Sequence, residues 1–508
     1  MKTTIFLYQL TIICIINLFA VNVPAQDYTP VTVMNLSLKD VITLTYKNNR
    51  SINNALLKRK SDQFDLLVEK DRFNPDLTIS TSTSRSSSLD KQKKMSRIRS
   101  TIDHYSVSTD VSVKLKTGAD LSLTWDGYQK RQSSSAMDYL NNYGYDDTKN
   151  IYDHQTELRF TQPLLKGFGV KVNTGPLKIA EINEEISKLT LKKTQITILT
   201  NAIITYRNLL YAQQQYEISK KSLDVSTKQY ELNKKLVERG RMASLDLVQS
   251  ENDVANKRIA LVLSENQLQQ KQFDLIQILD IETNHSIRAT DRISVENITG
   301  DRINLDHSNL IMVALLNNPD LLIALAQQRI SEINNMVASN YKQFDLSFTA
   351  GYSNNAVFDH MTTLFSHNYD TKNDSWDVGL FFTHTFGDLS DDQNCYRSKV
   401  NLRIAKNNVI DEKENLRIEV KNKIREVKIR KKQVDLSQKA RLLSEKKLAI
   451  ELKKLDMGRS SNFQIVSFQN DLVTAQTNEL LAIIEYYNSI ALLEQTLGIT
   501  LSKWNISI

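Results

Sequence analysis

Two stretches of this chain repeat one another and decide its fold: VERGRMASLDLVQSENDV (237–254) and LDMGRSSNFQIVSFQNDL (455–472), which lie 218 positions apart. Each carries a Gly-Arg pair between two long segments that contain almost no helix breakers. The coinciding positions are Gly240/Gly458, Arg241/Arg459, Val248/Val466, Asn252/Asn470 and Asp253/Asp471. Because glycine commonly ends a helix, each stretch predicts a tight turn between two helices. The chain therefore contains the same helix–turn–helix twice.

Two further echoes extend this repeat outward. VITLTYKNNRSINNALL (41–57) returns as LIMVALLNNPDLLIALA (310–326) at an offset of 269, and RFTQPLL (159–165) returns as FFTHTFG (381–387) at an offset of 222. An ordered set of echoes at a long period indicates two structurally similar halves. The fall in offset makes the β segment of the first half about 47 residues longer than that of the second.

The N-terminus predicts export. Lys2 precedes the apolar run Ile5–Ala20 and the small-residue site Val23-Pro24-Ala25, which is the pattern of a secretory signal peptide. A retained anchor helix is the alternative, but the run is shorter than the ~20 residues that a span needs. After cleavage Cys395 is the only cysteine, so neither a disulfide framework nor a cysteine metal site is expected. Export without disulfides is compatible with a bacterial envelope.

Few and long elements are expected, because the 508 residues include only 13 glycines and 6 prolines. The formal net charge of +7 comes largely from Lys and Arg spread along helical segments such as 421–433. Acidic residues interleave there and aromatic residues for base stacking are absent. This pattern indicates a solvated helix face and no nucleic-acid partner.

Helical periodicity follows each predicted turn on both sides. Apolar residues from Ile182 to Leu210 step by threes, fours and a seven, which is the seam of a coiled coil. The segment from Pro176 to Arg239 would make a rod of about 100 Å at 1.5 Å per residue. The helices are expected at about 38–73, 176–239, 245–279, 307–341, 394–457 and 463–497.

Between the helices, apolar residues alternate with Ser, Thr and other polar residues, which is the strand signal. The first β segment is expected at about 76–163, with Lys116-Thr117-Gly118 as a hairpin turn, and the second at about 343–386. The polar stretches 129–153 and 354–374 are expected to be exposed loops on the far side of the strands. The predicted order is a signal peptide (1–25), a first repeat (26–285), a linker or equatorial segment (286–306) and a second repeat (307–508).

The chain resembles the TolC-type outer-membrane efflux protein family. The resemblance rests on LSLKDVITLTYKNNRSI (36–52) and its echo VALLNNPDLLIAL (313–325), on FTQPLLKGFG (160–169), and on the two turn segments. It covers essentially the whole mature chain, and its specificity lies in the ordered set occurring twice. The resemblance implies an α+β membrane protein in which long coiled-coil helices form a trimeric periplasmic α-barrel and each protomer gives strands to a shared transmembrane β-barrel.

The resemblance also implies a function and partners. Family members are exit ducts of tripartite efflux or secretion systems, located in the outer membrane with a large periplasmic part. They are homotrimers that contact outer-membrane lipid and that dock, at the helix tips, with a periplasmic adaptor and an inner-membrane pump. They commonly have two strands per half, hence twelve per trimer. The longer first β segment leaves the strand number open here.

The residues expected to act lie at the two tips. Arg241 and Arg459 follow the glycines directly, and apolar residues follow them in turn, which indicates docking and gating surfaces; a plain helix stop is the alternative. Acidic residues that narrow the tunnel mouth in the family correspond here to Gln464 and Ser467, whereas the first tip has Asp246. The candidate site residues are Gly240, Arg241, Asp246, Gly458, Arg459 and Gln464. A contact between Asp246 and Arg459 is one hypothesis for closure.

No motif predicts an enzyme, a cofactor or a bound metal. The nearest approach to a metal cluster is His360, Met361 and His367, which an exposed loop explains better. Gly167 and Gly169 do not form a phosphate-binding loop, since no GK[ST] or GxGxxG pattern follows. The alternative to a channel is a periplasmic coiled-coil adaptor or a structural envelope protein, but neither explains β segments at matched places in both halves.

Overall fold

The computed structural model describes residues 32–90, 96–138, 143–282, 284–291, 306–358, 373–457 and 459–506. Among them lie two compact units. The first unit comprises the described parts of Met1–Arg50, Ile198–Arg302 and Val427–Ala491, and the second those of Ser51–Thr197, Ile303–Glu426 and Leu492–Ile508. These units cut across the two sequence halves, so the division into repeats stays a prediction. The signal peptide predicted at residues 1–25 lies outside the described residues.

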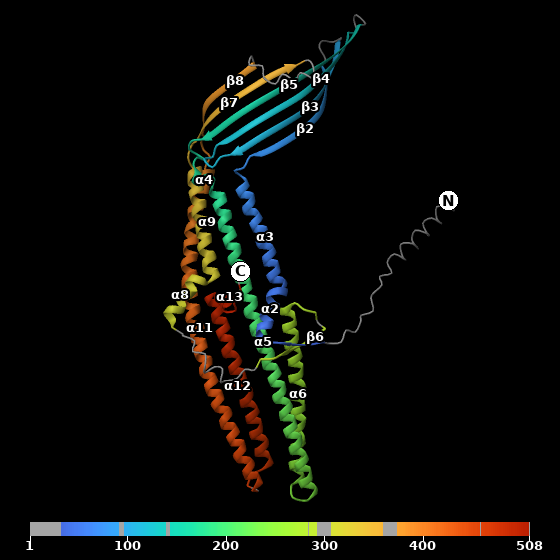
Figure 1. Cartoon of the computed structure of the whole chain (residues 1–508), viewed down its shortest axis with the longest axis vertical. Coiled ribbons are helices and arrows are strands. Elements are labelled where there is room, and N and C mark those ends of the chain that lie inside the picture. The colour runs from blue at the N-terminus through green and yellow to red at the C-terminus, as the bar shows by residue number, and fades with distance from the viewer. Residues whose placement is uncertain are drawn as a thin grey trace, which may run out of the picture. The chain divides into compact units, whose positions relative to one another are not determined.

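The second unit contains one antiparallel sheet of six strands (Figure 1). Its strands, in their spatial order, are β2 (Asp76–Asp90), β3 (Ser96–Lys114), β4 (Asp120–Asp138), β5 (Tyr143–Pro163), β7 (Asp345–Phe358) and β8 (Asp374–Thr383). Four strands come from the first half and two from the second. The longer first β segment is therefore one additional hairpin, and the first half contributes four strands to this sheet.

The hairpin turn predicted at Lys116-Thr117-Gly118 is confirmed. The N–H of Gly118 donates to the carbonyl oxygen of Leu115 at 2.9 Å, and Gly118 has φ +100°. A Cβ there would lie 2.5 Å from the carbonyl oxygen of Gly167. Glycine is thus required both by the backbone conformation and by the close approach of a second chain segment.

The prediction of exposed loops over 129–153 and 354–374 is wrong in part. Residues up to Asp138 belong to β4, those from Tyr143 belong to β5, and β7 continues to Phe358. These residues pair by backbone register with neighbouring strands although their side chains are polar on both faces. Composition cannot reveal such a strand, because backbone hydrogen bonds form it without an apolar face. Residues 139–142 and 359–372 lie outside the described residues.

The long predicted helices are confirmed with small shifts in their ends. Helix α5 (Gly175–Glu238) has 64 residues and α11 (Ser390–Asp456) has 67. Their returning partners are α6 (Ser244–Leu279) and α12 (Asn462–Leu497). The shorter helices are α2 (Leu38–Asn48), α3 (Arg50–Asp71), α4 (Val170–Asn173), α8 (His307–Asn317), α9 (Pro319–Tyr341) and α13 (Thr500–Lys503).

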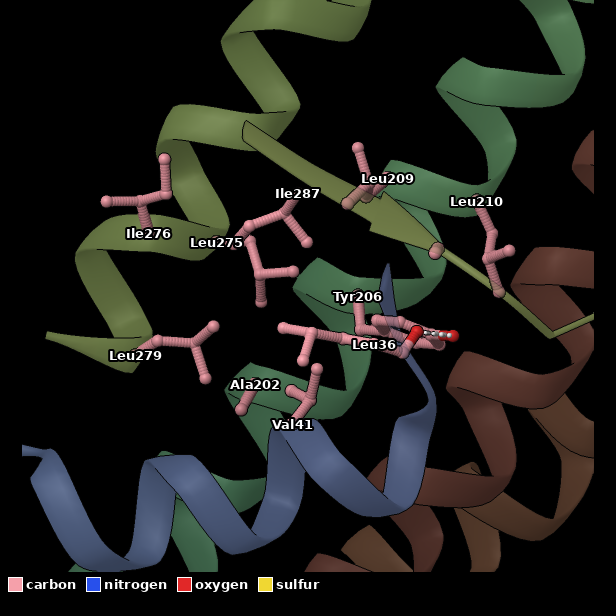
Figure 2. Packing of buried hydrophobic residues seen from close by; sticks show 11 residues of the cluster. Leu36, Val41, Ala202, Tyr206, Leu209, Leu210, Leu275, Ile276, Leu279 and Ile287 are labelled. Carbon is pink, nitrogen blue, oxygen red and sulfur yellow. Dashed lines mark hydrogen bonds between the residues drawn. The ribbon is translucent and has the colours of Figure 1, made fainter. Parts of the chain in front are cut away.

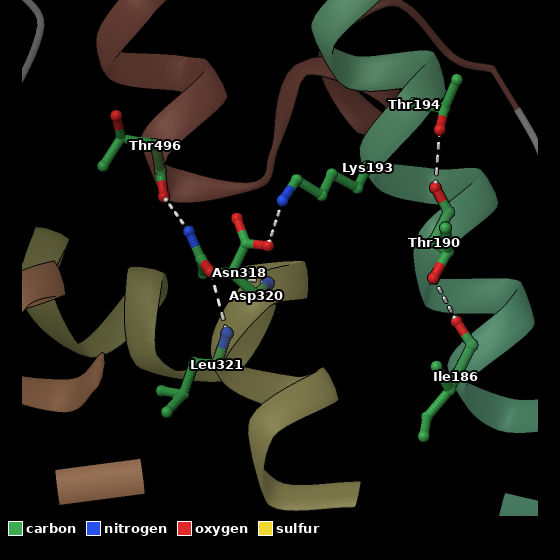
Figure 3. A network of polar contacts seen from close by, with 8 residues as sticks. All are labelled: Ile186, Thr190, Lys193, Thr194, Asn318, Asp320, Leu321 and Thr496. Atoms are coloured by element: carbon green, nitrogen blue, oxygen red, sulfur yellow. Dashed lines mark hydrogen bonds and ion pairs between the residues drawn. The ribbon is translucent and has the colours of Figure 1, made fainter. Parts of the chain in front are cut away.

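The two helices expected over 38–73 and 307–341 are each broken once, at Asn49 and at Asn318. Asn318 caps the next helix: its Oδ1 accepts the N–H groups of Asp320 and Leu321 at 2.9 and 3.2 Å. Its Nδ2 donates to the carbonyl oxygen of Thr496 at 3.0 Å (Figure 3). An asparagine that competes for backbone groups in this way favours a new helix start over continuation.

The same contact occurs in both halves, each within its own unit. The Nδ2 of Asn49 donates to the carbonyl oxygen of Ile278 at 2.9 Å, as that of Asn318 does to Thr496. Asn49 and Asn318 are the echoed asparagines at offset 269, and Ile278 and Thr496 are 218 positions apart. The duplication seen in the sequence therefore extends to a shared helix-end contact.

The first unit has an apolar core between α2, α5 and α6, with the parallel strand pair β1 (Thr32–Leu36) and β6 (His285–Ala289) alongside (Figure 2). Tyr206 of α5 lies in this core with its hydroxyl 3.0 Å from the carbonyl oxygen of Leu36 and 2.8 Å from Oδ2 of Asp291. Burial, and then the Asp291 carboxylate, raises the pKa of Tyr206. The phenol is therefore a neutral hydrogen-bonding group in a dry environment.

Within the described residues, no single helix is both long and apolar enough to cross a bilayer; α8 and α9 meet these criteria only as a pair, bent by 50°. The same residues contain no group of three His, Cys, Asp or Glu placed to hold a metal ion. The loop with His360, Met361 and His367 lies outside them.

Candidate functional site

The turn after α5 has the hydrogen bonds of a Schellman motif. The N–H of Gly240 donates to the carbonyl oxygen of Val237 at 2.9 Å, and that of Arg241 donates to Leu236 at 2.8 Å. Gly240 has φ +72°, the left-handed conformation that this motif places after a helix. No other atom lies within 4 Å of where a Cβ would be, so glycine is favoured here by backbone conformation alone.

The turn after α11 repeats this geometry as far as the structure describes it. The N–H of Arg459 donates to the carbonyl oxygen of Lys454 at 2.8 Å, matching Arg241 and Leu236; Gly458 itself lies outside the described residues. The start of the next helix differs between the tips. Ser461 accepts the N–H of Gln464 through its hydroxyl at 3.3 Å, whereas the equivalent Ala243 offers no side-chain cap.

The second tip has an additional link back to its long helix. The hydroxyl of Ser460 donates to Oε1 of the buried Glu451 at 2.7 Å, and Lys454 lies 3.1 Å from the same carboxylate. The hydrogen bond from Ser460, followed by that from Lys454, lowers the pKa of Glu451. The second turn is thereby tied to α11 by a charged hydrogen bond, for which the first tip has no counterpart among the described contacts.

The predicted site residues lie at the tips but do not all meet. Arg241, Arg459 and Gln464 are exposed, and Asp246 is partly buried. Gln464 accepts a hydrogen bond from Ser460 at 3.3 Å. In the part of the chain that the structure describes, Asp246 and Arg459 do not form an ion pair with each other. The hypothesis of a contact between them is therefore not met within one chain.

The structure instead brings together four polar residues that sequence reasoning missed. The Nδ2 of Asn233 lies 2.6 Å from Oγ of Ser250 and 3.0 Å from Oδ1 of Asn462, and Asn462 donates to Ser250 at 2.9 Å. Gln229 donates to Asn233 at 3.0 Å. We call these residues the tip cluster. Asn233, Ser250 and Asn462 are almost fully buried, so α5, α6 and α12 are joined by hydrogen bonds in a dry place.

A sequence signal for this cluster does exist. Buried residues of α5 recur every seven positions as Ala212, Ser219, Ser226 and Asn233, so the seam becomes small and then polar toward the tip. Ser226 donates to the buried Asp253 of α6 at 2.5 Å. A polar residue at a seam position fixes register and partner in coiled coils. The partner Asn462 is 229 positions away, however, and periodicity alone cannot find it.

Contacts within the first unit give the order of its four long helices. α5 contacts α6 through Ser226 and Asp253, and it contacts α12 where Arg207 donates to the carbonyl oxygen of Tyr487 at 2.6 Å. α12 contacts α11 through Glu479 and Arg441, 2.6 Å apart. Burial raises the pKa of Glu479 despite this partner. The order is therefore α6, α5, α12, α11, with α6 and α11 as the outer members; toward the tip, α6 also contacts α12 through Ser250 and Asn462.

Both outer helices carry apolar residues that the chain leaves uncovered. On α11 they are exactly one heptad apart and more than half exposed: Ile429, Leu436, Leu443 and Ile450, the α11 stripe. On α6 they recur at heptad-compatible spacings and are also more than half exposed: Val248, Ile259, Val262 and Phe273, the α6 stripe. Such stripes are coiled-coil seams that lack a partner helix.

A groove of about 690 Å³ lies in the same unit, lined by residues of α5, α11 and α12. Its lining combines apolar residues such as Val225 and Leu480 with the Arg441–Glu479 pair. The lining residues run from 214 to 225 on α5 and from 438 to 452 on α11, so the groove extends along the helices.

The sheet of the second unit has two chemically different faces. One backbone row crosses all six strands and is apolar throughout: Leu77, Val111, Leu123, Leu158, Tyr352 and Trp376. The next row projects from the opposite face and is polar throughout: Thr78, Asp110, Thr124, Glu157, Ser353 and Ser375. We call these the apolar row and the polar row. Apolar outside and polar inside is the pattern of strands between lipid and a water-filled lumen.

Comparison with known proteins agrees with this geometry. Residues 120–280 match the family model described as outer membrane efflux protein, roughly a third of the chain. No curated protein matches the sequence at a significant level.

Solved structures resemble nearly the whole chain. The Campylobacter jejuni CmeC outer membrane channel matches with a TM-score of 0.66 at 15% identity, over 91% of this chain and 85% of that one. The Vibrio cholerae outer membrane protein VceC gives 0.62 at 14%, over 91% and 96%. The open Neisseria gonorrhoeae MtrE outer membrane channel gives 0.61 at 14%, over 91% and 88%. These likenesses show the fold.

The fold, the two-faced sheet and the helix tips are those of outer membrane channels with long helices. Residues 120–280 resemble the outer membrane efflux protein family, and nearly the whole chain has the fold of the solved outer membrane channels. A periplasmic adaptor or a structural rod would not explain an apolar row that crosses all six strands of the sheet.

Proposed function

We propose that three copies of this chain assemble into one channel-tunnel, the exit duct of a tripartite efflux or secretion system. The observation that carries the proposal is the pair of uncovered stripes on α6 and α11, the two outer helices of the four-helix order. Packing the α6 stripe of one copy against the α11 stripe of the next buries both seams and continues the same helix order around a ring. A head-to-tail contact of this kind closes when the rotation per copy allows it.

Assembly also gives hydrogen-bond partners to the two edge strands of the sheet. Six strands from one copy leave two edges with free backbone groups, and lipid offers no partners for them. A barrel shared between copies pairs these edges. The chain is therefore proposed to function as a homotrimer, in contact with outer-membrane lipid through the apolar face of the sheet.

The tips are proposed to be where the tunnel meets its periplasmic adaptor and, beyond it, an inner-membrane pump. Supporting observations are the exposed Arg241 and Arg459 and, beside them, Leu245 and Phe463, which are 77% and 62% exposed at equivalent positions. Apolar anchors rimmed by charged groups are typical of protein interfaces. With Gly240, Asp246, Gly458 and Gln464 they form the proposed docking and gating surface, and the nearby groove offers room for a helical partner.

Assembly is tested by the mass of detergent-extracted protein. The parent is expected to be a trimer, and Leu443→Asp to be a monomer, since a charge would enter the α11 stripe. Lys431→Asp, an exposed change on the same helix but away from the α11 stripe, is the matched control and should remain trimeric. A stable monomeric parent would refute the proposal.

Docking is tested on the trimer with the adaptor found in the same cells. Leu245→Ser together with Phe463→Ser should abolish co-purification of the adaptor without changing the trimer mass. Leu263→Ser is the control: it is 65% exposed on α6, about 28 Å along the helix from its start at 1.5 Å per residue. Retention of the adaptor by the double variant would place docking elsewhere.

A further inference from the structure

The additional hairpin of the first half, β2 and β3, raises the question of whether it belongs to the barrel wall. The apolar row indicates that it does. Leu77 of β2 and Val111 of β3 continue the row of β4, β5, β7 and β8 without a shift of register, and Thr78 and Asp110 continue the polar row on the opposite face. A hairpin standing in water would not need a lipid-type face.

The exposure of apolar side chains on the two edge strands supports the same interpretation. Leu77 and Ile79 of β2 are 64% and 65% exposed, close to Val378 and Leu380 of β8 at 60% and 68%. These four residues lie on the two edge strands, and all project from the apolar face. An exposed apolar edge strand is an aggregation hazard unless another strand covers it. The two edges therefore need partners of the same kind.

Strand direction allows the two edges to pair with each other. Neighbouring strands of the sheet are all antiparallel, so β2 and β8 run in opposite directions. β8 of one copy can then take β2 of the next copy as another antiparallel neighbour. The pattern repeats without a parallel contact, as bacterial barrels with an even number of strands require.

We propose that β2 of each copy pairs with β8 of its neighbour, so that three copies close a barrel of eighteen strands instead of the twelve that the family resemblance implies. This inference rests on the proposed trimer. Barrel diameter grows roughly linearly with strand number, so the lumen is about one and a half times as wide as that of a twelve-stranded barrel. The polar row, with Asp110 and Glu157, lines it.

Cysteine cross-linking in isolated outer membranes tests the pairing. In a Cys395→Ser background, Leu77→Cys is combined in turn with one cysteine on β8. The β8 changes are Trp376→Cys, Val378→Cys, Leu380→Cys and Phe382→Cys, and together they cover the possible registers between β2 and the neighbour's β8. Mild oxidation is expected to give covalent dimers and trimers from at least one combination. The competing arrangement places β4 at the interface, and it is probed by Leu123→Cys with the same four changes on β8.

The outcomes separate the two proposals. The eighteen-stranded barrel is supported if variants with Leu77→Cys form cross-links and the corresponding variants with Leu123→Cys form none. A trimer by mass in which the Leu77 series does not cross-link overturns that barrel and leaves the assembly intact, whether or not Leu123 cross-links. A monomer by mass, with no cross-links in either series, overturns the proposed trimer itself.

Discussion

Helix α5 has two successive buried stretches in the first unit. The buried side chains are apolar in the earlier stretch and polar in the later one. Its earlier stretch buries Ala202, Tyr206 and Leu209 in the apolar core with α2 and α6. Its later stretch buries Ser226 and Asn233, which hydrogen-bond to α6 and α12. Separation of an apolar contact exposes area to water, whereas separated polar groups regain hydrogen bonds from water. Opening should therefore occur at the tips, with the apolar core as the fixed point.

The largest expected effect comes from the apolar stretch. Leu209→Ala removes a fully buried side chain, and such truncations cost about 2–5 kcal/mol because a cavity remains. The temperature at which the helical circular dichroism signal is lost should fall accordingly. Leu232→Ala, on the same helix but 56% exposed, should have a much smaller effect. Equal effects would mean that this core is not the fixed point.

A smaller effect is expected from the polar stretch, and it should be local. Asn233→Leu removes the hydrogen bonds that Asn233 donates to Ser250 and Asn462 in a buried place, at a cost of about 1–3 kcal/mol. The tips should then separate more often. Trypsin should cleave faster after the exposed Arg239 and Arg241, while the melting temperature changes less than with Leu209→Ala.

Asn256→Leu provides the matched control for that experiment, since Asn256 is an exposed asparagine of α6. Its cleavage rate should equal that of the parent. If Asn233→Leu also cleaves like the parent, the tip cluster does not hold the hairpins together.

The first turn can be perturbed without touching the cluster. Gly240→Val places a β-branched residue at φ +72°, which costs roughly 1–2 kcal/mol, and no neighbouring atom adds to it. Cleavage after Arg241 should rise modestly. Gly240→Asn should behave like the parent, because asparagine tolerates this conformation. Resistance of the valine variant to trypsin would show that the turn does not need a left-handed residue.

The smallest effect is expected from the charged residues singled out by sequence. Asp246→Ala combined with Arg459→Ala removes exposed or half-exposed groups that do not pair with each other in the described part of the chain, and such groups contribute at most about 1 kcal/mol. Single-channel conductance in planar bilayers should rise slightly, and less at high salt. Conductance equal to that of the parent would exclude these residues from gating, including contacts between copies.

Sequence predicted the features that depend on local pattern. The glycine turn at Gly240, the rods on both sides of it and the hairpin turn at Gly118 follow from periodicity and backbone freedom, which a few neighbouring residues decide. The breaks at Asn49 and Asn318 were missed, because each asparagine acts as a cap only when a distant carbonyl group holds its amide.

The remaining misses have the same origin. The polar ends of β4 and β5 were interpreted as a loop, since strand pairing there depends on backbone partners rather than on an apolar face. Asn233 looks like an ordinary solvated residue until Ser250 and Asn462 are placed beside it. Both features result from pairings over long sequence distances that a single sequence does not specify.

The central claim is that the channel opens by separation of the hairpins at the tip cluster. It is tested most directly by single-channel conductance of an Asn233→Cys/Asn462→Cys variant, in the Cys395→Ser background, before and after reduction. Oxidation should join α5 to α12 at the tip and hold the conductance at its closed level, and reduction should restore openings at least as frequent as in the parent. Equal conductance in the oxidised and reduced states, with the disulfide confirmed by mass, would contradict the claim.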